Sequence, residues 1–162
     1  MRLWHYKLLP YLPDAQFKGQ LRELVAIMND WRDKGETNHL LINRVMEYDK
    51  VHLTIYFLRY RQQYQIRYGK DIDQKLIIEF LQFSDYQLGM DFKIDPVTGK
   101  FVSVRLETDI FPGWHNKEYL RVCMANLYEK NRFGIGRSHI PDGEWKRLCD
   151  GYKAITGEDY SI

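Results

Sequence analysis

The sequence predicts a mainly α, compact single-domain fold over residues 1–162, with one small β-hairpin insertion. Apolar residues recur at helical spacing over most of the chain, and the pattern changes to that of strands only around residues 92–104. Neither a linker nor an internal repeat divides the chain. With 44% hydrophobic and 28% charged residues, the composition is that of a globular chain rather than a disordered one.

Four helices are predicted in the first half of the chain. The first runs from about Asp14 to Trp31, because its apolar residues lie three or four positions apart on one face and Gly35 follows as a stop signal. The other three are expected over Asn38–Tyr48, over Val51–Tyr68 and over Asp73–Phe83.

Residues 85–162 are predicted to hold the hairpin and the C-terminal helices. The hairpin is expected over Phe92–Val104, where residues of high strand propensity flank a turn at Pro96 and Gly99. The remaining elements are a helix over Lys117–Lys130, a loop over Phe133–His139 and a final helix capped by Asp142.

The composition argues against a membrane or secreted protein. No apolar run approaches the roughly 18 residues of a membrane span. Lys7, Pro10 and Pro13 interrupt the apolar residues at the N-terminus, so a signal peptide is not expected. Cys123 and Cys149 are expected to be two buried free thiols, with a disulfide as the alternative. The predicted location is therefore the cytoplasm.

Charge and spacing exclude several classes of site. The net charge is only +2, from 24 Lys and Arg against 22 Asp and Glu, so a nucleic-acid footprint must come from local clustering. The five histidines show no metal-ligand spacing, and the Gly134–Gly136 pair follows a predicted helix rather than a strand. We therefore expect neither a metal nor a cofactor.

Three short motifs near the N-terminus remain as candidates for chemistry: Met1-Arg-Leu-Trp-His5, Leu12-Pro-Asp14 and Leu21-Arg-Glu-Leu24. Their order and spacing resemble the pyrimidine-dimer DNA glycosylase family of the bacteriophage endonuclease V type, including bacterial relatives that open with MRLWH. The resemblance covers roughly residues 1–70. It implies a DNA-repair enzyme, a DNA glycosylase with abasic-site lyase activity, whose substrate is double-stranded DNA with a damaged or abasic site.

The chemistry that this resemblance implies uses the protein's own α-amine as nucleophile. The amine attacks C1′ of the damaged nucleotide, releases the base and forms a Schiff base that permits β-elimination. An α-amine, with a pKa of about 7.7–8.0, is roughly a tenth neutral at pH 7, whereas a lysine near 10.4 is almost fully charged. Because the bulky Arg2 blocks removal of the initiator, the nucleophile here is expected to be the amine of Met1.

Arg2 and Glu23 are expected to assist this amine. Arg2 would disfavour the ammonium form through its like charge and could hold a phosphate. Glu23 matches the family's essential carboxylate, which stabilises the cationic imine and moves protons. The alternative interpretation makes Arg22 and Glu23 ordinary solvated residues of a helix. His5 is interpreted either as a polar contact in the pocket or as a buried hydrogen-bonding residue.

The first helix departs from the family pattern at one place. Where the phage enzyme continues with another arginine, this chain has Val25, Ala26 and Ile27. Phosphate contacts are therefore expected from Arg44, Arg59, Arg61 or Arg132, and Arg22 is a further candidate for DNA binding.

Two alternative functions remain open at this stage. One is a non-catalytic nucleic-acid-binding module of the same fold, which would bind DNA but would not depend on Glu23. The other is a protein-interaction domain whose exposed tyrosines contact a partner. The lesion also stays open among a cyclobutane dimer, another damaged base and an abasic site.

Overall fold

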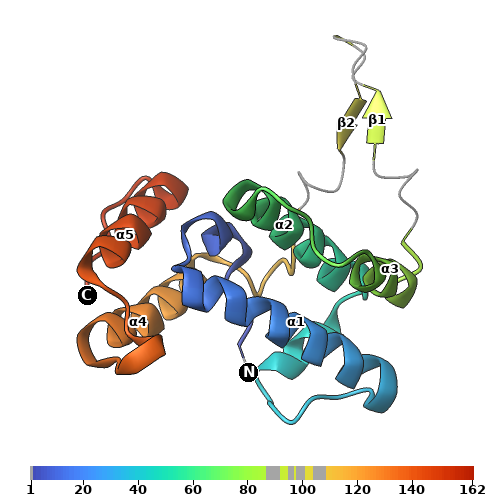
Figure 1. The fold of residues 1–162 in the computed structure, drawn as a ribbon, viewed down its shortest axis with the longest axis horizontal. Helices are drawn as coiled ribbons and strands as arrows, with labels where there is room; N and C mark the ends of the chain where they lie inside the picture. Colours follow the sequence, from blue (N-terminus) through green and yellow to red (C-terminus); the bar gives the residue numbers. More distant parts are fainter. Residues whose placement is uncertain (1, 87–91, 95–96, 98–100, 104–108) are drawn as a thin grey trace. The chain divides into compact units, whose positions relative to one another are not determined.

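Helices form the packed structure of the chain in a computed structural model, which describes residues 2–86, 92–94, 97, 101–103 and 109–162 (Figure 1). The chain divides into two compact units. The first contains Met1–Ala26 and Pro112–Ile162, and the second contains Ile27–Phe111. The boundary falls within the first long helix. That residues 1–162 act as a single domain stays a prediction.

The first unit brings the two ends of the sequence together. Its elements are the 3-10 helix η1 (Tyr6–Tyr11), the first part of helix α1 (Asp14–Lys34), helix α4 (Lys117–Phe133), the 3-10 helix η4 (Gly136–Ser138) and helix α5 (Asp142–Thr156). Helix α5 packs against both η1 and α4. The apolar side chains that form the core include Leu3, Leu8, Leu9, Leu12, Phe17, Leu120, Met124, Leu127, Leu148 and Tyr152.

The second unit is built around a pair of helices. Helix α2 (Val51–Tyr68) packs against helix α3 (Gln74–Phe83), and the 3-10 helix η2 (Ile42–Glu47) precedes them. The rings of Phe57 and Phe80 stack with their centroids 4.0 Å apart. The hydroxyl of Thr54 donates to the carbonyl oxygen of Phe80 over 3.0 Å. Apolar stacking and a satisfied buried hydroxyl together join α2 to α3.

Sequence signals place most helix ends correctly. The predicted helices that correspond to α1, α2, α3, α4 and α5 are all present. Gly69 ends α2 in the left-handed conformation, at φ +65°, where a side chain would be strained. Asp73 caps α3 by accepting from the backbone N–H of Lys75. Asp142 was expected to cap α5, but it is the first helical residue and Pro141 occupies the cap position. None of the described helices is long and apolar enough to cross a membrane.

The helix predicted over Asn38–Tyr48 forms only in part, as the six-residue 3-10 helix Ile42–Glu47. The side chain of Asn43 accepts from the backbone N–H of Thr37 over 2.8 Å, and the Thr37 hydroxyl accepts from the backbone N–H of His39 over 3.1 Å. Such local side-chain bonds offer the backbone an alternative to helical pairing. They hold residues 37–43 in a turn instead.

The hairpin in the predicted fold class also needs correction, because the fold is all-α. Between Phe92 and Ser103 the described residues are Val97 and two three-residue strands, β1 (Phe92–Ile94) and β2 (Phe101–Ser103), which pair antiparallel with Lys93 opposite Val102. An isolated pair this short is marginal in water and does not form a structural layer. The expected turn residues Pro96 and Gly99 lie outside the described residues.

A buried cluster of histidines lies between the N-terminal segment and α4 in the first unit. His5 is 3% exposed, and its Nδ1 accepts from the backbone N–H of Lys7. Its Nε2 therefore carries the proton and donates to the carbonyl oxygen of His115 over 2.9 Å. The Nδ1 of His115 in turn accepts from the backbone N–H of Tyr6. Burial, as the largest effect, lowers the pKa of His5 to about 4, so His5 is neutral at pH 7.

Both cysteines are free thiols, as predicted, but only Cys123 is fully buried, whereas Cys149 is half-buried. Burial raises the pKa of the Cys123 thiol to about 11. Its sulfur accepts from the backbone N–H of His5 over 3.4 Å. A thiol so rarely ionised is a packing residue rather than a nucleophile.

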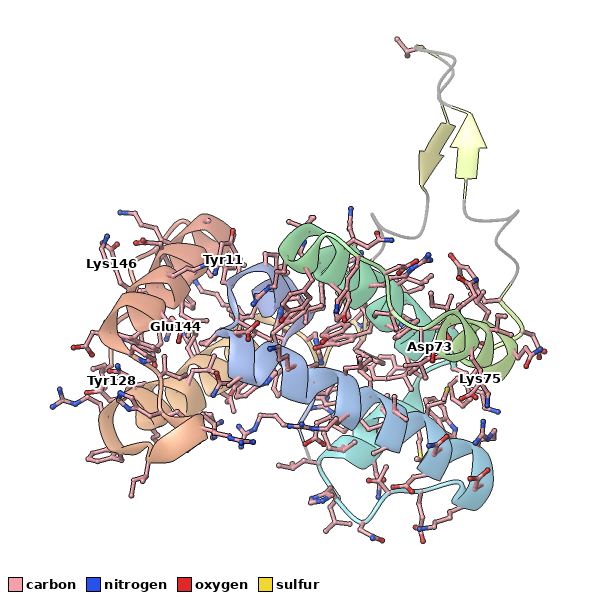
Figure 2. The ribbon with its side chains drawn as sticks, viewed as in Figure 1. Tyr11, Asp73, Lys75, Tyr128, Glu144 and Lys146 are labelled. Carbon is pink, nitrogen blue, oxygen red and sulfur yellow. The ribbon has the colours of Figure 1, made fainter. Side chains whose placement is uncertain are left out.

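The contact between η1 and α5 predicts that Gly151→Ala destabilises the protein. A Cβ at Gly151 would overlap the ring of Tyr11, with Cδ2 of that ring at 2.6 Å. Figure 2 labels Tyr11. We expect a loss of about 1–3 kcal/mol in the free energy of unfolding, measured by urea denaturation. Gly143→Ala, in the same helix with no atom near its added Cβ, is the control and should be neutral or slightly stabilising. Equal effects of the two substitutions would contradict this packing.

The depressed pKa of His5 predicts a specific loss of stability in acid. The unfolded chain binds this proton near pH 6.5, whereas folded His5 stays neutral down to about pH 4. The free energy of unfolding should therefore fall between pH 6.5 and pH 4, by up to about 3 kcal/mol from His5. His5→Gln should lose this part of the pH dependence, while His39→Gln, at an exposed position, should keep it. An unchanged pH profile in His5→Gln would rule the explanation out.

Candidate functional site

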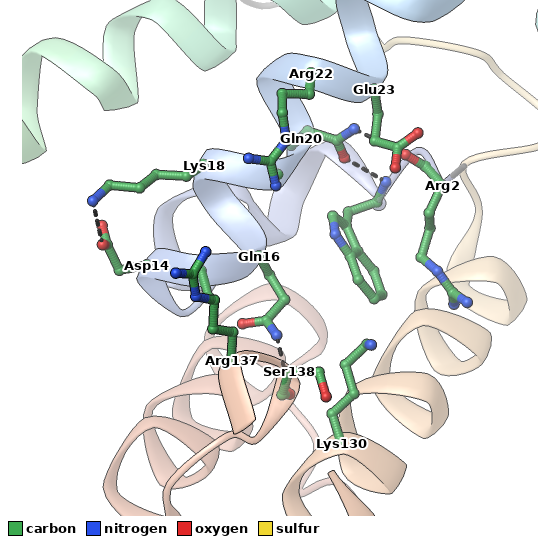
Figure 3. Close-up of a pocket in the computed structure, with 13 residues that line it drawn as sticks. Arg2, Asp14, Gln16, Lys18, Gln20, Arg22, Glu23, Lys130, Arg137 and Ser138 are labelled. Carbon is green, nitrogen blue, oxygen red and sulfur yellow. Dashed lines mark hydrogen bonds and ion pairs between the residues drawn. The ribbon is translucent and has the colours of Figure 1, made fainter. Parts of the chain in front are cut away.

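A cavity of about 680 Å³ lies in the first unit, and most of the N-terminal candidate residues line it (Figure 3). Its walls come from the N-terminal segment, the first turns of α1, the end of α4 and η4. The lining residues are Arg2, Trp4, Asp14, Ala15, Gln16, Lys18, Gly19, Gln20, Arg22, Glu23, Lys130, Arg137 and Ser138.

The side-chain amide of Gln20 attaches the N-terminal segment to α1. Its Oε1 accepts from the backbone N–H of Trp4 over 2.8 Å, and its Nε2 donates to the carbonyl oxygen of Arg2 over 2.9 Å. Gln20 is only 1% exposed, so neither bond competes freely with water. These two bonds, which we call the Gln20 clamp, fix the backbone of residues 2–4 against the helix.

Glu23 lies on the same side of α1 as the clamp. Gln16, Gln20 and Glu23 are spaced four and three residues apart, which places them one above another on a single helical face. Glu23 is half-buried at the cavity, whereas Arg22 lines the cavity with an exposed side chain. The carboxylate of Glu23 thus lies about one helical turn beyond Gln20, which holds the backbone of Arg2.

Arg2 and Trp4 form part of the cavity wall together. The guanidinium carbon of Arg2 lies 4.9 Å from the centroid of the Trp4 ring, within the range of a cation–π contact. Trp4 is 5% exposed, so it packs mainly in the core. The contact restrains the Arg2 side chain and keeps its positive charge beside the cavity.

The opposite wall comes from the C-terminal part of the chain. Lys130 lies on α4, and Arg137 and Ser138 lie on η4. The Nε2 of Gln16 donates to the carbonyl oxygen of Ser138 over 3.4 Å, which links α1 to η4.

The cavity carries an excess of positive charge. Five basic and two acidic side chains line it, and one of the two acids, Asp14, forms an ion pair with Lys18 over 3.0 Å. A concave surface with this balance concentrates anions such as phosphate groups. Among the described residues, no group of three or more His, Cys, Asp or Glu side chains could hold a metal ion.

Several predicted site residues do not line this cavity. His5 belongs to the buried histidine cluster, and Arg132 is exposed on α4. The other three, Arg44, Arg59 and Arg61, belong to the second unit. Arg61 forms a two-pronged ion pair with Asp71, at 2.9 and 2.7 Å, and these bonds lower the pKa of the Asp71 carboxyl. A role of these residues in DNA binding stays a prediction, and Met1 lies outside the described residues.

Sequence reasoning missed the two glutamines of the site. A signal for them exists in the sequence, because Gln16, Gln20 and Glu23 make a polar stripe on a helix that is otherwise apolar along its core face. Lys130 and Arg137 also line the cavity. Their position in the cavity depends on how residues 112–162 fold back onto α1.

Comparison with known proteins gives one match. No curated protein and no solved structure matches the chain. Residues 1–75 match the family model described as pyrimidine dimer DNA glycosylase. The matched range includes Arg2, the Gln20 clamp and Glu23, whereas Lys130, Arg137 and Ser138 lie beyond it. The match confirms, over residues 1–75, the predicted resemblance to the pyrimidine dimer DNA glycosylase family, and it indicates an enzyme of the DNA glycosylase class that acts on DNA.

Proposed function

We propose that the chain is a DNA glycosylase with abasic-site lyase activity, in which the α-amine of Met1 is the nucleophile and Glu23 is the catalytic carboxylate. The Gln20 clamp is the observation that supports this most strongly. It holds Arg2 on the face of α1 that carries Glu23, beside a positively charged cavity. Met1 directly precedes Arg2 in the sequence.

The proposed reaction uses an amine and a carboxylate of the chain, and water hydrolyses the final imine to release the protein. The amine forms a bond to C1′ of the damaged nucleotide, and the base leaves with the electrons of its glycosidic bond. Opening of the sugar ring gives a protonated imine, which the negative charge of Glu23 stabilises. Removal of a proton from C2′ then expels the 3′ phosphate, and Glu23 accepts or relays that proton.

The basic side chains of the cavity have a separate task. Arg2, Lys130 and Arg137 come from three different segments and surround the space into which the sugar would enter. We infer that they bind the phosphates next to the extruded nucleotide, since a nucleotide must leave the base stack before its C1′ can be attacked. Binding should weaken steeply with salt, because each phosphate contact releases counterions. The family match favours a pyrimidine dimer in double-stranded DNA as the substrate.

The role of Glu23 can be tested with Glu23→Gln, by measuring borohydride trapping on a duplex that contains one abasic site. The substitution keeps the shape of the side chain but removes the charge that stabilises the imine. We expect the rate of adduct formation to fall by about 10²-fold or more, with DNA affinity unchanged. Glu129→Gln, at an exposed position on α4 outside the cavity, is the matched control and should react like the wild type.

Two results would contradict this assignment. If wild type binds DNA with a normal salt dependence but forms no adduct, the chain is a non-catalytic binding module. If Glu23→Gln reacts as fast as Glu129→Gln, the carboxylate has no part in the chemistry. Absence of any salt-dependent DNA binding would favour a protein-interaction domain instead.

The second prediction concerns the clamp itself. Gln20→Met keeps the length of the side chain but removes both hydrogen bonds, leaving the N–H of Trp4 and the carbonyl of Arg2 without them. We expect a loss of about 1–3 kcal/mol in the free energy of unfolding. We also expect slower adduct formation at saturating DNA, because the amine is no longer held in place. Gln62→Met, at an exposed position on α2, controls for the added thioether. A folded Gln20→Met protein with an unchanged rate would show that the clamp does not position the amine.

A further inference from the structure

Two large apolar side chains are exposed where α4 ends. Phe133 is 78% exposed and Ile135 is 87% exposed, and they lie two residues apart. Arg132 precedes them and Arg137 follows, both with exposed side chains. A single exposed apolar residue is common on protein surfaces, but a pair held between two arginines indicates a contact surface.

The segment that carries this pair is firmly anchored at its base. Asn131, 8% exposed, donates through its side chain to the carbonyl oxygen of Ile140 over 2.8 Å and to the Asp142 carboxylate over 2.9 Å. The backbone N–H groups of Gly134 and Ile140 both donate to the carbonyl oxygen of Lys130. These bonds close residues 131–140 into a fixed loop. The loop therefore holds Phe133 and Ile135 in their exposed positions.

Close packing at Gly134 adds to this rigidity. A Cβ at this position would overlap the Lys130 carbonyl and would lie 2.8 Å from the α-carbon of His139. Only glycine therefore fits between the two ends of the loop. Further along, the hydroxyl of Ser138 donates to the carbonyl oxygen of Ile135 over 3.0 Å, which restrains the backbone that carries the second apolar side chain.

The same loop forms part of the candidate site. Lys130, Arg137 and Ser138 line the cavity, and Ser138 is bonded to Gln16 of α1. Phe133 and Ile135 lie in the sequence between these lining residues but do not line the cavity themselves. One rigid loop thus presents basic groups to the cavity and apolar groups to the solvent beside it.

We propose that Phe133 and Ile135 form a wedge that inserts between base pairs next to the lesion, while Arg132 and Arg137 bind the flanking phosphates. Apolar wedges of this kind unstack a base step and bend the duplex. Unstacking would help to extrude the nucleotide that the cavity must receive. This inference rests on the proposed function, and it assigns a role to a loop outside residues 1–75, the range that matches the glycosylase family.

Charge and size favour a duplex over other occupants. The arginines on either side and the basic cavity complement a polyanion. Two side chains bury at most a few hundred Å², well below the roughly 800 Å² that each partner of a stable protein complex buries. A base step, in contrast, is of the size that one aromatic and one aliphatic side chain can fill.

The test compares wild type with the double variant Phe133→Ala/Ile135→Ala on an abasic site placed either in a duplex or in a single strand. Extrusion from a stack is needed only in the duplex. The variant should form the borohydride adduct about tenfold more slowly on the duplex, the loss expected for one stacking contact, and at the wild-type rate on the single strand. Ile66→Ala/Ile162→Ala removes two other exposed apolar side chains and should match the wild type on both substrates.

A second readout does not depend on the chemistry. A 2-aminopurine next to the abasic site brightens when it is unstacked, and the variant should lose the increase that wild type produces on binding the duplex. The apolar substitutions should leave the salt dependence of binding unchanged. Arg132→Gln/Arg137→Gln should lower the slope of log K against log salt by about 1 for each arginine.

The outcomes separate the wedge from the proposed function. If wild type forms no adduct even on the single strand, the lyase proposal fails, and loss of the fluorescence change in the variant still supports the wedge. If the variant reacts with the duplex and unstacks it as wild type does, the wedge is wrong while the lyase stands. Equal losses on both substrates would also overturn the wedge. The wedge would likewise be overturned if the variant behaved normally on the duplex but lost binding to phosphatidylserine vesicles, because the apolar pair would then contact a membrane surface.

Discussion

The buried amide of Gln20 bonds an irregular N-terminal segment at two backbone atoms, and two further side chains complete the attachment. Residues 2–5 belong to no helix or strand, so their polar backbone groups need other partners. Gln20 bonds the carbonyl oxygen of Arg2 and the N–H of Trp4. The hydroxyl of Tyr119 donates to the carbonyl oxygen of Leu3, and the sulfur of Cys123 accepts from the N–H of His5. Side chains of α1 and α4 thus supply the hydrogen bonds that a neighbouring strand would otherwise provide. The position of residues 2–5 depends on these bonds.

The candidate site then divides between the two ends of the sequence. The glycosylase family match covers the residues that would carry the chemistry, while α4 and η4 supply basic groups beyond it. Beyond Leu24, helix α1 continues with Val25, Ala26 and Ile27 in place of a further arginine, and Ile27 is fully buried there. A charged side chain at that position would lose its hydration on burial and would have no opposite charge to compensate for the loss. Lys130 and Arg137, on the facing wall of the cavity, provide positive charge in its place.

How much the sequence can predict depends on how local the cause is. Helix α2 ends where Gly69 predicts, because the turn needs only that residue's conformation. The stretch before α2 forms less helix than predicted, because apolar periodicity does not reveal the side-chain bonds between Thr37 and Asn43. Glu23 could be found from its motif. The clamp could not, since Gln20 bonds residues 16 and 18 positions away. The burial of His5 likewise depends on a partner 110 residues further along.

The most direct test of the central claim is to locate the covalent bond in the borohydride-reduced adduct. The trapped protein would be digested and its DNA-linked peptide sequenced by mass spectrometry. The account predicts that the reduced sugar is attached to the α-amine of Met1. Two other primary amines, on Lys18 and Lys130, line the same cavity and serve as internal controls. Attachment to either lysine would contradict the account, because the Gln20 clamp would then not position the nucleophile.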